Sequence, residues 1–502
     1  MEILLFLSSG LFLGWSLGAN DAANVFGTAV GTRMIKFRTA AIVCSIFIVL
    51  GATISGAGAA HTLGKLGAVN ALAGSFTVAL AAALTTFWMT RLKIPVSTSQ
   101  AIVGAIIGWN IYSSSVTDMK SLTKIMLTWV ACPLISAAIA VVLFILVRKL
   151  ISMNKPHLLR LDAGTRLGLL AVGAFGSYSL GANNIANVMG VFVPDNPFND
   201  VSVFGLFTLT GVQQLFFLGA VAIGVGVFTY SERVMKTVGG GLVKVSPVPA
   251  LVIVLSQSIT LFLFASSSLE HFLASHGLPT FPLVPVSSSQ AVVGAILGIS
   301  LFKGANIRYN VLGEISLGWM ATPLAAGVVS FFLLFFVDNV FDQQVSRTVQ
   351  YRIDGVVREE LAQRGVEVEG LIELGPGVFT NAVKFKSDLE KTGGLDHQQS
   401  ALVLELARLG RWEVQESVIA GDVDAHWLTT GQLDALRTLN GQRFDHLWRF
   451  NAALANASDE WKLKPDATVN KQTNKELKKK LVYLGRLFKV DLVSDNPDKE
   501  AG

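Results

Sequence analysis

Ten long apolar runs occupy the first two thirds of this 502-residue chain. Most are near the ~20 residues that a helix needs to cross a bilayer, and a backbone surrounded by lipid must satisfy its own hydrogen bonds. The runs cover residues 4–30, 39–60, 70–90, 96–112, 123–147, 167–192, 201–229, 247–266, 285–302 and 311–337. We therefore predict an α-helical polytopic protein of the cell membrane. The runs at 96–112 and 285–302 are short for a crossing, and each could instead form a re-entrant hairpin with the run before it.

Charge separates this apolar part from the rest of the chain. Charged residues make up 15% of the whole, against about 25% in soluble domains. Residues 1–337 hold 18 basic and 9 acidic residues, whereas residues 338–502 hold 22 and 26. We therefore predict a membrane part and a mainly helical soluble C-terminal domain over 338–502. The basic residues of the membrane part lie between apolar runs and not on one folded face, so the expected partner is the lipid bilayer and not nucleic acid.

The basic residues of the loops predict the orientation of the chain, because cytoplasmic loops carry an excess of lysine and arginine. One set of alternate loops carries Arg33, Lys36, Arg38, Arg91, Lys93, Arg148, Lys149, Lys155, Arg160, Arg166, Arg233, Lys236, Lys244, Lys303 and Arg308. The opposite set carries only Lys65, Lys120 and Lys124. This asymmetry places the N-terminus outside, and ten passes place the C-terminal domain outside as well. The first run is too long for a cleaved signal sequence and no basic segment precedes it, so we expect it to be retained as a span.

The membrane part contains an internal repeat. The matched segments are Ser16–Gly27 with Ser179–Gly190 (9 of 12 positions identical), Pro95–Gly108 with Pro285–Gly298 (11 of 14), and Trp129–Leu134 with Trp319–Leu324. Two copies are predicted, at 1–150 and 151–337, and the odd number of passes in each makes them inverted relative to each other. Small residues also help helices to pack closely, but packing does not explain the repeated polar residues. Inverted repeats with interrupted apolar segments are typical of secondary transporters, with the site near the bilayer midplane.

Asp21 is the one charged residue inside the apolar runs and away from their ends. Such a charge costs at least about 2.5 kcal/mol on insertion scales, which favours a functional role. We expect Gly18 to break the helix, so that Asn20, Asp21 and Asn24 offer oxygen ligands to a small hard cation. The alternative is a structural acid that hydrogen-bonds to the broken helix.

The repeated Pro-Val-Ser segments are expected to form the complementary half of the site. Proline fits the first turn of a helix, and the hydroxyls that follow it would cluster with free N–H groups at the helix start, which is a typical anion site. The residues concerned are Ser97, Thr98, Ser99 and Gln100 in the first copy, and Ser287, Ser288, Ser289 and Gln290 in the second. A single cluster of this kind is more often a helix cap, but duplication within the membrane favours binding. The anion would be held by neutral donors, helix dipoles and bound cations.

At this level of detail the sequence resembles the inorganic phosphate transporters, which include sodium–phosphate symporters. The resemblance covers about residues 1–337 and lies in Gly18–Asn24, Gly181–Asn187, Pro95–Gln100 and Pro285–Gln290. It implies cation-coupled phosphate uptake by a homodimer, with Asp21, Asn24 and Asn187 among the site residues. This chain differs from the family pattern at Asn184, where a second aspartate is usual, and at Gln100 and Gln290, where many members have histidine.

Together these observations give two sets of candidate ligands. The sodium candidates are Asp21, Asn20, Asn183 and Asn184. The phosphate candidates are Ser97, Thr98, Ser99, Gln100, Ser287, Ser288, Ser289, Gln290, Asn24 and Asn187. Sodium is preferred over a proton because asparagine-rich oxygen ligands coordinate a metal ion better than they relay a proton. Sulfate remains the alternative anion, because the substitution at Asn184 removes an acid that can accept the O–H of phosphate.

The C-terminal domain offers no catalytic pattern. Helical spacing is predicted over Ser400–Leu409, Leu433–Ala455 and Lys475–Leu487, with turns at Gly375–Gly377 and Gly393–Gly394. The three histidines of this domain, His397, His426 and His446, have no ligand or triad spacing. We therefore predict a transporter and no enzyme, with a membrane-anchored receptor or enzyme acting through this domain as the remote alternative.

Overall fold

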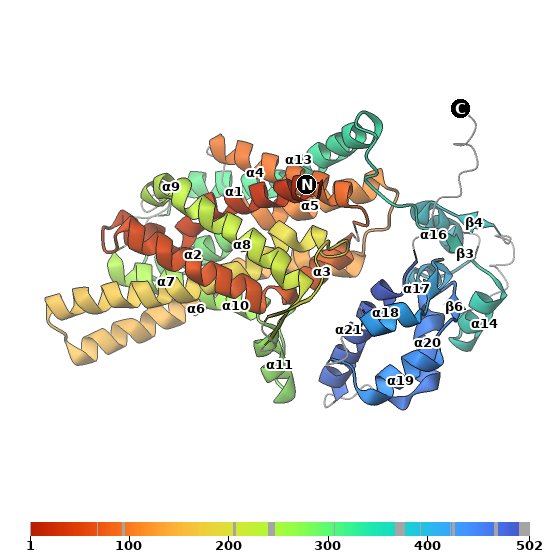
Figure 1. Ribbon diagram of the computed structural model, residues 1–502. Coiled ribbons are helices and arrows are strands. Elements are labelled where there is room, and N and C mark those ends of the chain that lie inside the picture. Colours follow the sequence, from red (N-terminus) through yellow and green to blue (C-terminus); the bar gives the residue numbers. More distant parts are fainter. Residues whose placement is uncertain are drawn as a thin grey trace. The chain divides into compact units, whose positions relative to one another are not determined.

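A computed structural model describes residues 2–67, 69–92, 96–203, 207–238, 246–305, 307–366, 377–391, 393–421, 423, 427–465 and 470–490. The chain divides into two compact units. Unit 1 comprises Met1–Leu273 with Pro279–Arg347, and unit 2 comprises Ala274–Leu278 with Thr348–Gly502. Figure 1 shows their helices and strands.

Helices make up nearly all of the described chain up to residue 339. They are α1 (Glu2–Gly31), α2 (Phe37–Ser55), α3 (Ala57–Leu66), α4 (Leu72–Arg91), α5 (Thr98–Tyr112), α6 (Met119–Asn154), α7 (Leu158–Met189), the 3₁₀-helix η1 (Gly190–Phe192), α8 (Gly211–Thr229), α9 (Ser231–Val238), α10 (Pro247–Ala265), α11 (Ser267–Ser275), α12 (Ser288–Phe302) and α13 (Tyr309–Asn339). Within the described residues, 7 of these helices are long and apolar enough to cross a membrane: α1, α2, α4, α6, α8, α10 and α13. This confirms the predicted helical polytopic fold.

The helices of unit 1 differ in whether they are long enough to cross a bilayer. With 15 residues each, α5 and α12 extend about 22 Å at 1.5 Å per residue, short of the ~30 Å hydrocarbon core. By contrast, α6 has 36 residues and α7 has 32. Figure 1 shows the turn between α6 and α7 projecting beyond the other helices of unit 1. The predicted boundary between the two copies, at 150/151, falls inside α6 and stays a prediction.

Two of the predicted spans are wrong in detail. The run at 39–60 divides at Gly56 into α2 and α3, where a Cβ atom would lie 2.3 Å from the Ile185 side chain. The run at 201–229 begins with an antiparallel hairpin of β1 (Val201–Val203) and β2 (Phe207–Leu209), and its helix starts only at Gly211. Thr210 caps that helix, since its hydroxyl accepts the Gln213 N–H while the Gln213 side chain accepts the Thr210 N–H, and such a capping box sets the helix start.

The expected break at Gly18 does not occur. Helix α1 continues through Gly18, and α7 continues through the equivalent Gly181. A Cβ atom at Gly18 would lie 1.9 Å from the carbonyl oxygen of Ile223, and one at Gly181 would lie 2.2 Å from that of Ile48. Both glycines therefore permit two helices to touch, in the way that small residues do in membranes.

The chain is interrupted instead just before α5 and α12, where the hydroxyl motifs lie. The two copies exchange partners around these short helices, because α5 packs on α13 and α12 packs on α6. A Cβ atom at Gly104 of α5 would lie 2.0 Å from the Pro323 carbonyl, and one at the equivalent Gly294 of α12 would lie 2.2 Å from the Pro133 carbonyl. This reciprocal packing relates the copies in space, while their inverted orientation stays a prediction.

Unit 1 extends past its last helix, ten residues beyond the predicted boundary at 337. Val345 is fully buried, and its carbonyl accepts a 2.9 Å hydrogen bond from the Trp109 indole of α5. The amide side chain of Asn70 exchanges two hydrogen bonds with the backbone of Arg347. Residues 340–347 therefore belong structurally to the membrane part.

The described residues of unit 2 are mainly helical, with two small antiparallel strand pairs. Its elements are β3 (Tyr351–Arg352), α14 (Gly355–Gln363), β4 (Val378–Phe379), α16 (Ala382–Lys391), α17 (His397–Ala407), β5 (Trp412–Glu413), α18 (Glu416–Gly421), α19 (Thr430–Thr438), β6 (Arg443–Phe444), α20 (Leu447–Ala457), the 3₁₀-helix η2 (Asp459–Trp461) and α21 (Lys471–Leu487). β3 pairs with β4, and β5 pairs with β6. The helix predicted over Leu433–Ala455 is wrong: Gly441, with φ +79°, and β6 separate α19 from α20. His426 and residues 375–376 of the predicted turn lie outside the described residues.

Candidate functional site

The starts of α5 and α12 lie against each other in a symmetric arrangement. The hydroxyl of Ser99 donates to the Val286 carbonyl at 3.2 Å, and the hydroxyl of the equivalent Ser289 donates to the Val96 carbonyl at 3.2 Å. The equivalent serine of each copy therefore bonds to the equivalent valine carbonyl of the other copy. The pairing fixes the two helix N-termini, with their partial positive charge, side by side.

The first serine of each motif acts as the helix cap. Ser97 Oγ accepts a hydrogen bond from the Gln100 N–H at 3.4 Å, and Ser287 Oγ accepts one from the Gln290 N–H at 3.3 Å. The capping and binding interpretations of these motifs are therefore not exclusive. The cap serine orders the first turn, and the next two hydroxyls of each motif remain for other contacts.

Helix α1 of the first copy meets α12 of the second copy at Asp21. The Ser288 hydroxyl donates to Asp21 Oδ2 at 2.8 Å, and the Asn20 amide donates to Asp21 Oδ1 at 3.3 Å. The Asn24 amide donates to Ser288 Oγ at 3.2 Å. The Asp21 carboxylate is buried, with 3% of its surface exposed, and its described hydrogen-bond donors are neutral.

Helix α7 of the second copy meets α5 of the first copy in the corresponding way. The Asn187 amide donates to Ser99 Oγ at 2.8 Å and to Asn184 Oδ1 at 3.0 Å. Asn183 holds the backbone of Val286 from both sides, donating to its carbonyl at 2.6 Å and accepting its N–H at 3.0 Å. Each asparagine-rich segment thus contacts the first turn of a short helix of the other copy, Ser288 in α12 or Ser99 in α5.

Several buried polar atoms of this site lack a hydrogen-bond partner among the described residues. They are Asn184 Nδ2, Asn187 Oδ1, Gln100 Oε1, Gln290 Oε1 and Gln257 Oε1. An unsatisfied buried polar group costs about 1–3 kcal/mol, so a cluster of them indicates a place where a ligand can supply the missing bonds. Donors and acceptors both occur, which suits an anion together with a cation.

Gln257 of α10 is a site residue that the sequence reasoning missed. Its amide donates to the backbone carbonyl of Asn24 at 2.6 Å, and its side chain is fully buried. The available signal was a glutamine flanked by Ser256 and Ser258 inside an apolar run. It lies outside both repeated motifs, so the repeat gave no reason to select it.

The structure brings together most of the predicted site residues. Ser288 bonds to the side chains of Asp21 and Asn24, and Asn20 bonds to Asp21. Ser99 bonds to the side chain of Asn187, which in turn bonds to Asn184. Gln100 and Gln290 are buried at the two helix starts, and Thr98 is buried in the first turn of α5. Among the residues that the structure describes, no group of three or more His, Cys, Asp or Glu side chains could hold a metal ion. A cation at this site would therefore depend mainly on amide, hydroxyl and backbone oxygens with one carboxylate.

The sequence of this chain is similar to those of the phosphate transporter family. The sequence profile of the phosphate transporter family matches residues 17–330 and 272–388. A protein of Methanocaldococcus jannaschii, provisionally named a phosphate permease, is 28% identical over 336 residues, which cover 66% of this chain and 97% of that protein. A protein of Pyrococcus furiosus with the same provisional name is 25% identical over 411 residues, covering 65% and 94%.

A solved structure agrees with these sequence matches. It is described as the sodium-dependent phosphate transporter, with a TM-score of 0.52 and 22% identity, and it covers 67% of this chain and 99% of its own. At this identity the match establishes similarity of fold. The profile covers well over half of the chain, so the resemblance in the motifs is confirmed: this chain is a multi-pass membrane protein that belongs to the phosphate transporter family, and it is a transporter and not an enzyme.

Proposed function

We propose that the protein is a secondary active symporter that couples the movement of Na⁺ to that of inorganic phosphate. The observation that carries this proposal is the Asp21 carboxylate, buried inside the membrane part and held by Ser288 of the other copy. A buried charge at this depth needs compensation. A cation that arrives with the substrate supplies it, and its departure with the substrate resets the site.

The cation is assigned to the Asp21 side of the site. Asp21 supplies the negative charge, Asn20 lies against it, and carboxylate and carbonyl oxygens are the ligands that hard cations prefer. Sodium fits this set better than a proton, because the neighbouring amides can coordinate a metal ion but neither gain nor lose a net proton near neutral pH. The fold is also shared with a structure described as a sodium-dependent phosphate transporter.

The phosphate is assigned to the paired starts of α5 and α12. Ser288 and Ser99 face α1 and α7, and the helix N-termini add partial positive charge for an anion. Because lysine and arginine are absent from the described hydrogen bonds of these serines, the anion is held without a strong ion pair. Weak multiple contacts let the substrate leave on the opposite side of the membrane.

The asparagines of α7 are assigned to the anion or to the cation according to which side-chain atom lacks a hydrogen-bond partner. Asn184 presents a free Nδ2 donor among the described residues, which suits an anion, and Asn187 presents a free Oδ1 acceptor, which suits a cation or the O–H of phosphate. Both amide atoms of Asn183 bond to Val286, so Asn183 orders the interrupted segment. This refines the assignment made from sequence, which placed Asn183 and Asn184 at sodium and Asn187 at phosphate.

The hydrogen bonds between the two copies of the repeat suggest how the site could open alternately to the two sides of the membrane. The bonds Asp21–Ser288 and Asn187–Ser99 each join one copy to the other. Relative rocking of the copies would therefore alter the two contacts together. Binding of Na⁺ at Asp21 and of phosphate at the serines would change the balance between the two states, because ligands shift such equilibria through differential contacts.

Assembly as a homodimer and an extracytoplasmic C-terminal domain are part of the proposal.

Labelled phosphate uptake into reconstituted vesicles tests the function. An inward Na⁺ gradient should drive uptake above the level reached with K⁺ in its place, and a pH gradient without sodium should not. Uptake driven by the pH gradient alone would replace Na⁺ by H⁺. Unlabelled arsenate should compete with phosphate and sulfate should compete poorly, whereas sulfate that displaces phosphate at comparable concentration would favour the sulfate alternative.

A further inference from the structure

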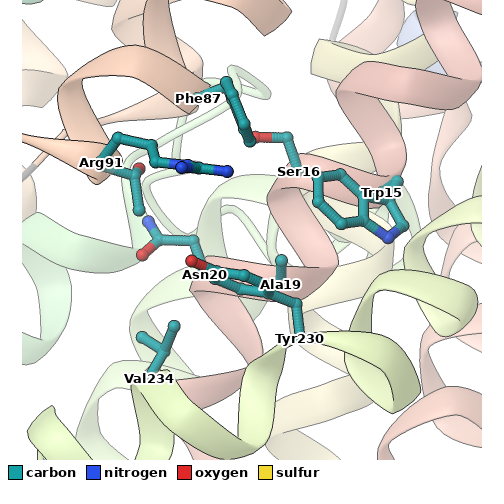
Figure 2. Close-up of a pocket in the computed structure, with 9 residues that line it drawn as sticks. Trp15, Ser16, Ala19, Asn20, Phe87, Arg91, Tyr230 and Val234 are labelled. Atoms are coloured by element: carbon teal, nitrogen blue, oxygen red, sulfur yellow. The ribbon is translucent and has the colours of Figure 1, made fainter.

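A small pocket lies between α1, α4 and the junction of α8 with α9, beside the Asp21 site (Figure 2). Its walls include the aromatic side chains of Trp15, Phe87 and Tyr230, and Arg91 points into it. Its free volume is about 10 Å³, room for roughly one water molecule. The proposed function makes no use of this pocket.

Aromatic contacts hold Arg91 at the pocket. Its guanidinium carbon lies 5.2 Å from the centroid of the Phe87 ring, a cation–π distance, and the Trp15 ring lies 6.4 Å from Phe87. Arg91 is exposed, and no ion pair with an acidic side chain is found for it in the described part of the chain. Its N–H groups therefore remain available to an anion, and their fork geometry matches phosphate oxygens.

A single side chain separates this pocket from the carboxylate of the site. Asn20 lines the pocket, and its amide donates to Asp21 at 3.3 Å. The wall beside it is closed, since a Cβ atom at Gly226 of α8 would lie 2.1 Å from the Trp15 carbonyl. The Trp15 indole also donates to Thr229 at 2.9 Å, which fixes the ring. A route from Arg91 to the site would therefore pass Asn20.

We propose that Arg91 forms a second phosphate subsite at this pocket, on the path between the Asp21 site and one face of the membrane. The proposal rests on the proposed function. Arg91 attracts the anion and releases it again, because its guanidinium is exposed to solvent and also attracted to the face of the Phe87 ring. For phosphate to pass through the pocket, the rings of Trp15, Phe87 and Tyr230 must separate, since the present volume of the pocket admits about one water molecule.

The test compares phosphate kinetics from the two faces, in intact cells and in inside-out membrane vesicles. Arg91→Gln should raise the half-saturating phosphate concentration about 10-fold from one face only, with the maximal rate changed less than about 2-fold. High ionic strength should reduce the difference. Arg91→Lys should recover part of the wild-type value, because it keeps the charge but loses the fork geometry of the guanidinium.

Arg38→Gln is the matched control. Arg38 is exposed in the first turn of α2 and belongs to the same predicted set of basic loops, so it tests whether any lost charge at this face has the same effect. Its phosphate kinetics should equal those of wild type. A half-saturating concentration in Arg91→Gln that is unchanged, or raised equally from both faces, would overturn the subsite.

Vesicle composition separates free phosphate from a lipid headgroup. On our proposal Arg91→Gln shifts the half-saturating concentration equally in phosphatidylcholine vesicles and in vesicles that also contain phosphatidylglycerol. A shift confined to the second kind would assign Arg91 to the lipid. Wild-type protein that fails to transport phosphate would contradict the proposed function itself, whereas wild-type transport with unchanged Arg91→Gln kinetics contradicts only this inference.

Discussion

The hydroxyl of Ser288 donates a 2.8 Å hydrogen bond to the carboxylate of Asp21, which lies 267 positions earlier in the chain. The two residues belong to different copies of the repeat. Their contact therefore connects a charge in one copy with a helix start in the other. Any movement of one copy against the other changes the environment of the charge, which is the requirement for coupling ion binding to conformation.

Gly18→Ala should destabilise the protein, because its Cβ atom would lie 1.9 Å from the Ile223 carbonyl. Overpacking typically costs about 1–3 kcal/mol, and the neighbouring atom here is backbone. The melting temperature of the detergent-solubilised protein should fall. Gly64→Ala in α3 is the control, since no heavy atom lies within 4 Å of its Cβ position, and it should melt like wild type or slightly higher. Equal melting temperatures for both variants would contradict the packing role of Gly18.

Gly18 also shows what the sequence could not settle. A glycine that breaks a helix and a glycine that lets two helices touch look the same in the sequence. The difference depends on Ile223, which lies far away along the chain. By contrast, the starts of α5 and α12 were predictable because a serine at the N-cap determines a helix start locally. The expected place of the proline was wrong in the second copy, since Pro285 lies two residues before the Ser287 cap and not in the first turn of α12.

The repeat in the sequence pointed to most of the candidate site residues, but it did not show which residues of one copy contact which residues of the other. Ser99 and Ser289 were expected to act alike, and they do make equivalent bonds to Val286 and Val96. That each serine contacts the other copy is a consequence of tertiary packing, which the sequence does not record. Gln257 was missed for a related reason, because it belongs to neither repeated motif.

Asn184→Asp should raise the half-saturating phosphate concentration about 10-fold, because it replaces a free N–H donor by a carboxylate and a hydrogen bond to a charged group is worth about 1.5–3 kcal/mol. Labelled phosphate uptake measures this. Asn154→Asp makes the same chemical change at an exposed position and should have no effect. Unchanged phosphate dependence with altered sodium dependence would instead assign Asn184 to the cation.

Unit 2 should lose stability in acid through Asp354. Burial raises the pKa of this carboxyl, but the Val357 N–H, His446 and Arg352 together hold it below its usual value. A lowered pKa contributes stability that is present above the ordinary carboxyl value, near 4, and is lost as the pH falls through the folded value. Asp354→Ala also removes the cap of α14, at a cost of about 1 kcal/mol.

Hydrogen exchange of the full-length protein measures this effect. In Asp354→Ala, the amides of α14 should exchange about 5-fold faster than in wild type at neutral pH, and the difference should shrink below about pH 4. Asp354→Asn should be intermediate, because asparagine caps a helix but carries no charge. A difference that persists unchanged in acid would show that the charge of Asp354 does not contribute.

The predicted orientation can be tested with single cysteines on a background without Cys44 and Cys132. Ala457 at the end of α20 and Ala163 in α7 are both exposed. A cysteine replacing Ala457 should react with an impermeant maleimide in intact cells, because the C-terminal domain is predicted outside. A cysteine replacing Ala163 should react only after lysis. The reverse pattern would mean that the number of crossings is odd where an even number was predicted, or that the loops face the other way.

Sodium-driven phosphate uptake by Asp21→Asn is the most direct test of the coupling role. The asparagine can still accept the Ser288 hydrogen bond, so the variant should fold and melt like wild type, yet it lacks the buried charge that attracts the cation. Glu314→Gln, which neutralises an exposed acid in α13, controls for the loss of one charge. We expect Asp21→Asn to lower sodium-dependent uptake on the order of 1000-fold, consistent with about 4 kcal/mol of attraction at 4 Å in a partly screened site, while Glu314→Gln transports normally. Wild-type uptake by Asp21→Asn with the same sodium dependence would contradict the assignment of Asp21 to the coupling cation.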